Sequence, residues 1–169
     1  KTATLLSRPG NMPLTPQFTP RDYFPKCVVV KPIDALLLNS VGLSNPGIHE
    51  LMMAGEWQQL TDPFLLSIMS LADTPEKRFE ELQRMVEIIG LWKPRFSAPF
   101  GVQINLSCPN TGHDPRVLIG ESAKVLEIAN TLGVPIMPKY SIATAPIQAV
   151  LELNDHPGCD AICVSNTLP

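Results

Sequence analysis

The chain has 169 residues, of which 44% are hydrophobic and 17% are charged, and its net charge is -3. This length suits one domain, and the charged fraction is below the roughly 25% of typical soluble domains, so much of the chain is expected to be buried. There is no basic cluster and no apolar run near the ~18 residues of a membrane helix, so we expect neither nucleic acid nor a membrane as a partner.

Strands and helices are predicted to alternate along the chain after an irregular, proline-rich segment at 9–32. Short apolar runs predict strands at 35–38, 63–69, 100–106, 134–137 and 160–164. Amphipathic runs predict helices at 46–57, at 121–132, at 145–153 and after Thr74-Pro75. Asn45 and Thr74, each followed by proline, are the expected N-caps of the first two helices along the chain.

This alternation predicts an α/β fold with a parallel sheet, either a (β/α)8 TIM barrel or a doubly wound open sheet. Four predicted strands are followed by polar groups, at Asn39, at Asn105 with Cys108, at Lys139 and at Asn166. Only in a barrel do all these strand ends converge on one mouth, and no G-x-G-x-x-G follows a strand, so the barrel is favoured.

A complete barrel needs about 250 residues and eight strands. We therefore expect residues 1–169 to form a single partial barrel domain of about five to six strands, truncated at both ends.

The four cysteines, at 27, 108, 159 and 163, form no C-x-x-C pair and have no histidine at metal-ligand spacing. We therefore expect a reducing, cytoplasmic setting and no metal site. Cys108 is the candidate catalytic residue, and its thiol could be a nucleophile, a redox group, a general base or a small core residue.

Amide side chains recur at the predicted strand ends, at Asn39, Asn105, Asn110 and Asn166. Each can donate and accept hydrogen bonds, so a ring of them suits a planar ligand with alternating C=O and N–H groups. Asparagine also caps turns, which is the alternative role for one or two of these residues. Lys139 either stabilises negative charge on a bound ring or reaches solvent.

Five motifs occur in this order: residues 1–4 with Arg8-Pro9-Gly10-Asn11, residues 39–47, Asn105-Leu106-Ser107-Cys108-Pro109-Asn110, Lys139, and Asn166-Thr167. Together they resemble the dihydroorotate dehydrogenase family over nearly the whole chain. The cysteine motif is the most specific of them, and cysteine at this position is similar to the soluble classes of the family.

The resemblance implies an FMN-dependent oxidation of dihydroorotate to orotate in pyrimidine biosynthesis, with Cys108 as the general base and hydride transfer to FMN. It implies substrate contacts from Asn39, Ser40, Val41, Gly42, Leu43, Asn105, Asn110, Asn166 and Thr167. It implies cofactor contacts from Lys1, Thr2, Asn105 and Lys139. It also implies that residues 1–169 alone bind FMN poorly and are inactive.

The implied partners are a small pyrimidine substrate and either a second copy of the chain or an iron–sulfur flavoprotein subunit. Two other functions stay open at this point. A related flavin-dependent dihydropyrimidine dehydrogenase shares Leu-Ser-Cys-Pro but has histidine where Asn110 stands. The other alternative is a non-catalytic, truncated barrel fragment.

Overall fold

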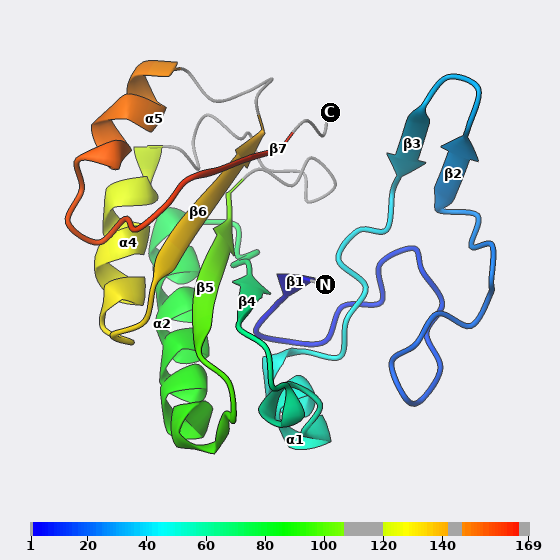
Figure 1. Cartoon of the computed structure of the whole chain (residues 1–169), viewed down its shortest axis with the longest axis horizontal. Coiled ribbons are helices and arrows are strands. Elements are labelled where there is room, and N and C mark those ends of the chain that lie inside the picture. Colours follow the sequence, from blue (N-terminus) through cyan, green and yellow to red (C-terminus); the bar gives the residue numbers. More distant parts are fainter. Residues whose placement is uncertain (1, 107–119, 142–146, 166–169) are drawn as a thin grey trace.

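A computed structural model describes residues 2–106, 120–141 and 147–165 of the chain (Figure 1). Its centre is a five-stranded sheet in which every pair of neighbouring strands is parallel. The strands, in their order across the sheet, are β1 (Thr2–Ala3), β4 (Phe64–Ile68), β5 (Phe100–Asn105), β6 (Ile136–Ser141) and β7 (Cys163–Ser165).

The order of the strands distinguishes the two predicted architectures. Each strand of the sheet pairs with the next parallel strand along the chain, whereas a doubly wound sheet reverses its order at a switch point. The helices α2 (Pro75–Trp92), α4 (Ser122–Asn130) and α5 (Ile147–Asn154) lie on one face of the sheet (Figure 1). This single direction of winding is that of a (β/α)8 barrel, so the predicted fold class, a barrel present in part, is confirmed.

The remaining helical segments of the described residues are short. They are α1 (Ile48–Ala54), which connects β1 to β4, and the two 3₁₀ turns Trp57–Gln59 and Lys93–Arg95. Among the helices that the structure describes, none is long and apolar enough to cross a membrane.

The hydrophobic core lies between the sheet and the helices. The strands contribute Leu66, Ile68, Val102, Ile104 and Ile136, and the helices contribute Leu82, Met85, Ile89, Leu126 and Ala129, all of them buried. Burying one such large side chain stabilises the fold by roughly 1.5–3 kcal/mol, so this layer is the main source of stability. Helix α2 begins as predicted, because the Thr74 hydroxyl accepts a hydrogen bond from the Lys77 N–H at 3.4 Å.

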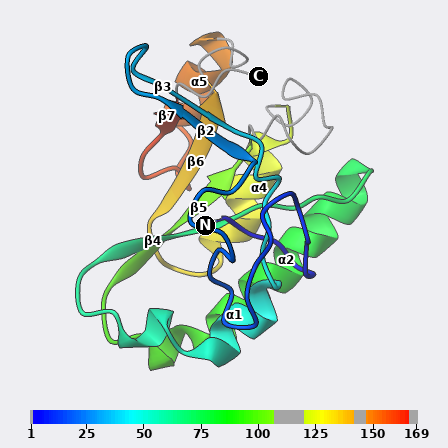
Figure 2. The ribbon, with the colours of Figure 1, turned by 90° about the vertical axis from the view of Figure 1, so that its right-hand side faces the viewer.

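The prediction of a barrel strand at 35–38 is wrong. That segment forms β3 (Leu36–Asn39), which pairs antiparallel with β2 (Val28–Lys31) in a separate two-stranded sheet. Figures 1 and 2 place this hairpin away from the helices, at the height where β5 and β6 end. An apolar run is typical of a buried parallel strand, but Leu37 of this run is 60% exposed. Asn39 therefore lies at the end of a hairpin strand and not at the end of a barrel strand.

Strand β6 begins later and extends further than predicted, and Lys139 lies within it rather than after it. It also contains Pro138, which lacks the N–H that a central strand normally donates. The Lys139 carbonyl oxygen accepts a hydrogen bond from the Leu106 N–H of β5. Because the backbone groups of successive residues point to alternate neighbours, the backbone nitrogen of Pro138 faces β7. Among the residues that the structure describes, strand β7 pairs with Lys139–Ser141, so Pro138 precedes the paired stretch.

A buried polar contact joins β6 to the first turn of α4. The Tyr140 hydroxyl donates to Ser122 Oγ at 2.8 Å, and both residues are buried. Burial raises the pKa of Tyr140 to about 12, although the hydrogen bond to Ser122 acts in the opposite direction.

We predict that this phenol makes the fold less stable at high pH. Between about pH 10 and pH 12 the unfolded phenol ionises while the native one keeps its proton, so the free energy of unfolding falls by about 2–3 kcal/mol across this range. Urea unfolding at a series of pH values, with the Tyr140→Phe variant for comparison, measures this slope. Tyr23→Phe, which removes an exposed tyrosine, is the control. Equal slopes in wild type and Tyr140→Phe would contradict the prediction.

Candidate active site

The two faces of the sheet differ in polarity. On the face opposite the helices, the register places Thr2, Ser67, Gln103 and Met137 side by side across four strands. Thr2 Oγ1 and Ser67 Oγ are hydrogen-bonded at 2.9 Å. Each of these side chains alternates along its strand with the buried residues of the core, and each is itself only partly buried. The helix-free face thus offers hydroxyl and amide groups to whatever covers it.

Asn105 and Lys139 are neighbours at the end of this face. They are direct partners in the β5–β6 register, and Cys163 of β7 is the partner of Lys139 on its other side. Asn105 is buried, and Lys139 is half-buried. The sequence predicted that these two residues meet at a common edge of the sheet, and in the structure they do.

The segment that resembles the substrate loop of the family, residues 39–47, begins at the end of the hairpin and is anchored by Arg8. The Arg8 Nε donates to the Gly42 carbonyl oxygen at 2.7 Å. The backbones of Arg8 and Asn45 also exchange two hydrogen bonds, at 2.7 and 2.9 Å. The conformation at Gly42 and Leu43, both at positive φ, is therefore held from outside the loop.

Asn11 and Gly10 complete this anchor. The Asn11 backbone N–H donates to Val41 O at 2.9 Å, and the Asn11 side-chain amide donates to Ser40 O at 2.6 Å. Gly10 has φ +52°, and a Cβ there would lie 2.2 Å from Ser44 Oγ and 2.5 Å from Val41 O. Only glycine fits so close to the loop backbone, which explains the Arg8-Pro9-Gly10-Asn11 sequence in physical terms.

Asn45 does not cap α1, contrary to the prediction. Gly47 is the N-cap residue, and the Asn45 side chain instead accepts from Gly47 N at 2.9 Å and donates to Leu43 O at 2.6 Å. Its amide also bonds Thr4 Oγ1 at 2.9 Å, which ties the loop to the residue after β1. Asn45 is buried and fixes the exit of the substrate loop rather than the start of a helix.

An open groove of about 490 Å³ lies beside this junction, lined mainly by residues 7–15. It contains none of the predicted site residues, so we place the candidate active site at Asn105 and Lys139 instead.

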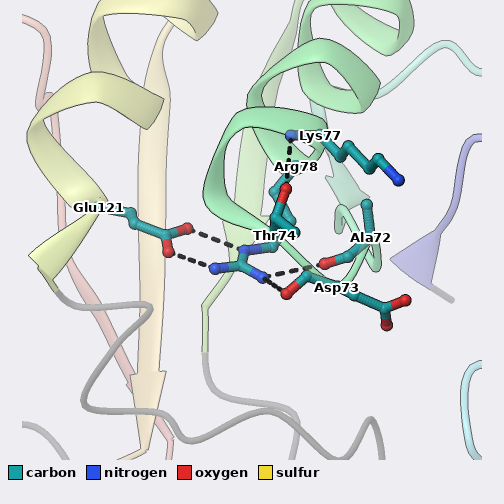
Figure 3. Close-up of polar contacts among 6 residues, drawn as sticks. All are labelled: Ala72, Asp73, Thr74, Lys77, Arg78 and Glu121. Carbon is teal, nitrogen blue, oxygen red and sulfur yellow. Dashed lines mark hydrogen bonds and ion pairs between the residues drawn. The ribbon is translucent and has the colours of Figure 1, made fainter.

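The loop between β4 and α2 is held by hydrogen bonds from two side chains of α2, Arg78 and Glu81; Figure 3 shows those of Arg78. Glu81 accepts from the Leu71 and Ala72 N–H groups at 2.8 and 3.1 Å. Arg78 Nη1 donates to the carbonyl oxygens of Ala72 and Asp73 at 2.9 and 3.1 Å. This loop follows the strand next to β5, so the surroundings of Asn105 are ordered from the helix side.

Arg78 also forms a bidentate ion pair with Glu121, at the start of α4 (Figure 3). The Nε–Oε2 distance is 2.9 Å, and the side chains are only 6% and 10% exposed. The hydrogen bond to Glu121 raises the pKa of Arg78, whereas its burial acts in the opposite direction. The pair joins the amino-terminal ends of α2 and α4.

Several predicted site residues lie outside the described part of the chain. They are Lys1, Cys108, Asn110, Asn166 and Thr167. Their roles stay predictions. Within the described part, Thr2, Asn105 and Lys139 lie on or at the end of the helix-free face, whereas Asn39 and Ser40 are exposed at the base of the hairpin.

Three further residues share the helix-free face and were not predicted from the sequence: Ser67, Gln103 and Cys163. A signal was present, because Ser67 and Gln103 interrupt apolar strands at alternate positions. Cys163 adjoins Lys139, whereas burial raises the pKa of the Cys159 thiol, which makes Cys159 a poor candidate for a reactive group.

The comparison with known proteins supports the resemblance. Dihydroorotate dehydrogenase B (NAD(+)), catalytic subunit, of Thermotoga petrophila is 24% identical over 173 residues, which cover 99% of this chain and 55% of that protein. The protein of the same name in Caldicellulosiruptor bescii is 28% identical over 78% of this chain and 42% of its own. Dihydroorotate dehydrogenase A (fumarate) of Lactobacillus helveticus is 28% identical, with the same coverage.

The resemblance to the dihydroorotate dehydrogenase family is confirmed. No family model matches the chain. The chain spans about half the length of the curated relatives that it matches.

We predict that Gly10→Ala disrupts the anchor of the substrate loop. The added methyl group would collide with backbone atoms of residues 41 and 44, so it should destabilise the protein by about 1–3 kcal/mol beyond the cost of a left-handed alanine. Gly55→Ala is the matched control, because Gly55 also has positive φ (+76°) but its Cβ would lie 3.9 Å from the nearest atom. Denaturant unfolding of the two variants compares them, and equal losses of stability would refute the anchor.

Proposed function

We propose that the complete protein oxidises dihydroorotate to orotate with FMN as cofactor, in pyrimidine biosynthesis. The observation that carries this proposal is the pairing of Asn105 with Lys139 at the end of the helix-free face, directly before the Leu-Ser-Cys-Pro-Asn sequence. The similarity to dihydroorotate dehydrogenases over nearly the whole chain supports it.

The described residues fit a flavin. Its ring edge alternates carbonyl and N–H groups, and the helix-free face presents side chains of both donor and acceptor type at Thr2, Gln103 and Asn105. Lys139 adds a positive charge beside Asn105, which would favour negative charge on a bound ring. When bound, FMN would accept the hydride that leaves C6 of dihydroorotate.

The chain's own groups would bind and deprotonate the substrate. Cys108, as thiolate, would remove the proton from C5, a step that needs a base of pKa near the working pH. The amides of Asn39, Asn105, Asn110 and Asn166 would hold the pyrimidine ring and its carboxylate. Residues 40–43 and Thr167 would complete the substrate contacts, and Lys1 and Thr2 those to the flavin.

The proposal also covers the cellular compartment and the electron acceptor of the reaction. We place the protein in the cytoplasm and expect residues 1–169 alone to be inactive. The relatives include one named for NAD(+) and one named for fumarate. The electron acceptor is therefore either fumarate, in an enzyme of one kind of subunit, or NAD through an iron–sulfur flavoprotein subunit.

Anaerobic addition of dihydroorotate to the purified complete protein tests this function. We expect a bound flavin spectrum that bleaches on addition of dihydroorotate and does not bleach with dihydrouracil. Bleaching by dihydrouracil alone would instead identify a dihydropyrimidine dehydrogenase. A protein without flavin would favour the non-catalytic fragment.

We predict that Cys108→Ser retains FMN but reduces it at least about 100-fold more slowly near neutral pH, because serine is a far weaker base. Stopped-flow absorbance of the flavin measures the rate. Cys159→Ser, which alters a half-buried cysteine remote from Asn105 in sequence, is the control and should reduce flavin at the wild-type rate. An unchanged rate in Cys108→Ser would remove this residue from the mechanism.

A further inference from the structure

A small cavity with mixed polar and apolar walls lies at the end of β5, between the sheet and the helices. Its volume is about 20 Å³, and Ser70, Arg78, Asn105, Leu106 and Glu121 are among its lining residues. One water molecule needs roughly 10–15 Å³ of such space and between two and four polar partners. The cavity is therefore the size of a single water.

Ser70 supplies the first reason to place a water there. Its Oγ is buried, yet it has no hydrogen-bond partner among the residues that the structure describes. A buried hydroxyl without a partner is destabilising, and most such groups in native proteins are satisfied by protein or by ordered water.

The Arg78–Glu121 pair supplies the other partners. Arg78 makes four hydrogen bonds in the described structure, two to Glu121 and two to backbone carbonyls, out of five N–H groups. One N–H is left to donate. The Glu121 carboxylate accepts two of these bonds and has further lone pairs. A water in the cavity can accept from Arg78 and donate to Ser70 and Glu121.

We propose that this cavity holds one ordered water, bound by Ser70 and the Arg78–Glu121 pair, and that these three side chains position Asn105. The second half of the proposal rests on the function proposed above. Ser70, Arg78 and Glu121 are positioning residues, because they act on substrate and flavin only through the end of β5.

The geometry of the strand explains how they act. Ile104 and Leu106 are buried in the core, so by alternation the Asn105 side chain faces the opposite side of the sheet, while residue 105 itself adjoins the cavity that the cluster of Ser70, Arg78 and Glu121 also lines. The end of β5 is thus held from β6 by the Leu106 N–H to Lys139 O bond of 3.0 Å and from the helix side by the cluster. Loss of the cluster removes the support on the helix side, while the pairing with β4 and β6 remains.

The water itself is tested by crystallography of the complete protein at a resolution that shows ordered solvent. We expect one water within hydrogen-bond distance of Ser70 Oγ and of Arg78 or Glu121, and its loss or displacement in Ser70→Ala. A cavity without density, or one filled by a protein side chain, would overturn the water site whatever reaction the protein catalyses.

The positioning role is tested by orotate binding, followed through the absorbance change of the bound flavin. Glu121→Gln and Ser70→Ala should weaken orotate binding roughly ten-fold or more with unchanged FMN content, because small displacements of contact groups reduce binding and rate steeply. Glu127→Gln is the matched control, since Glu127 is on the same helix but pairs with Lys124 at an exposed site. It should bind orotate as wild type does.

The variants and the wild type together separate failure of the positioning role from failure of the proposed function. If Glu121→Gln folds poorly, Ser70→Ala still decides, since it leaves the ion pair intact. Orotate binding unchanged in Ser70→Ala, or weakened equally in Glu127→Gln, would overturn the positioning role. If wild type itself fails to bind orotate, the proposed function fails, and the crystallographic result alone decides the water site.

Discussion

The parallel pairing of each strand with the next one along the chain is the constraint on which the other features depend. Because all five strands run in one direction, their carboxyl ends share one edge, and the backbone register makes Asn105 and Lys139 neighbours. The short β1 adds the amino-terminal segment to the same sheet, through only Thr2 and Ala3. The position of residues 4–11, and hence of the loop that they anchor, follows from this pairing.

The division of polar groups between the two faces of the sheet argues for a site. Parallel strands covered on both sides normally read as continuous apolar runs. Here Ser67, Gln103 and Lys139 alternate with buried core residues, so one face is built for packing and the other is not. Polar side chains on an enclosed barrel face are costly unless a ligand or water satisfies them. The polar residues of the helix-free face therefore fit the proposed ligand site better than a role in packing.

The features that follow from local chemistry could be predicted from the sequence. Thr74 followed by Pro75 identified the start of α2, and the alternation of apolar runs identified the parallel sheet. The prediction for 35–38 was wrong because hydrophobicity reports that a strand forms but not which sheet it joins. Asn45 was misassigned for a similar reason, since an asparagine side chain can form the hydrogen bonds of a helix N-cap or those that hold a loop. Nothing local signals the Arg78–Glu121 pair, because its partners are 43 residues apart.

The late start of β7 determines how firmly Lys139 is held. Pro138 has no N–H to offer, and in the described part of the chain the pairing with β7 accordingly starts at Lys139, at the end of β6 that carries the candidate site. On its other side, β6 pairs with β5 from Ile136 to Lys139. Lys139 is therefore the one residue of β6 that is paired with both neighbours in the described sheet. The backbone of Lys139 is therefore fixed on two sides, between Asn105 and Cys163. This limits the positions that the ammonium group of its flexible side chain can reach.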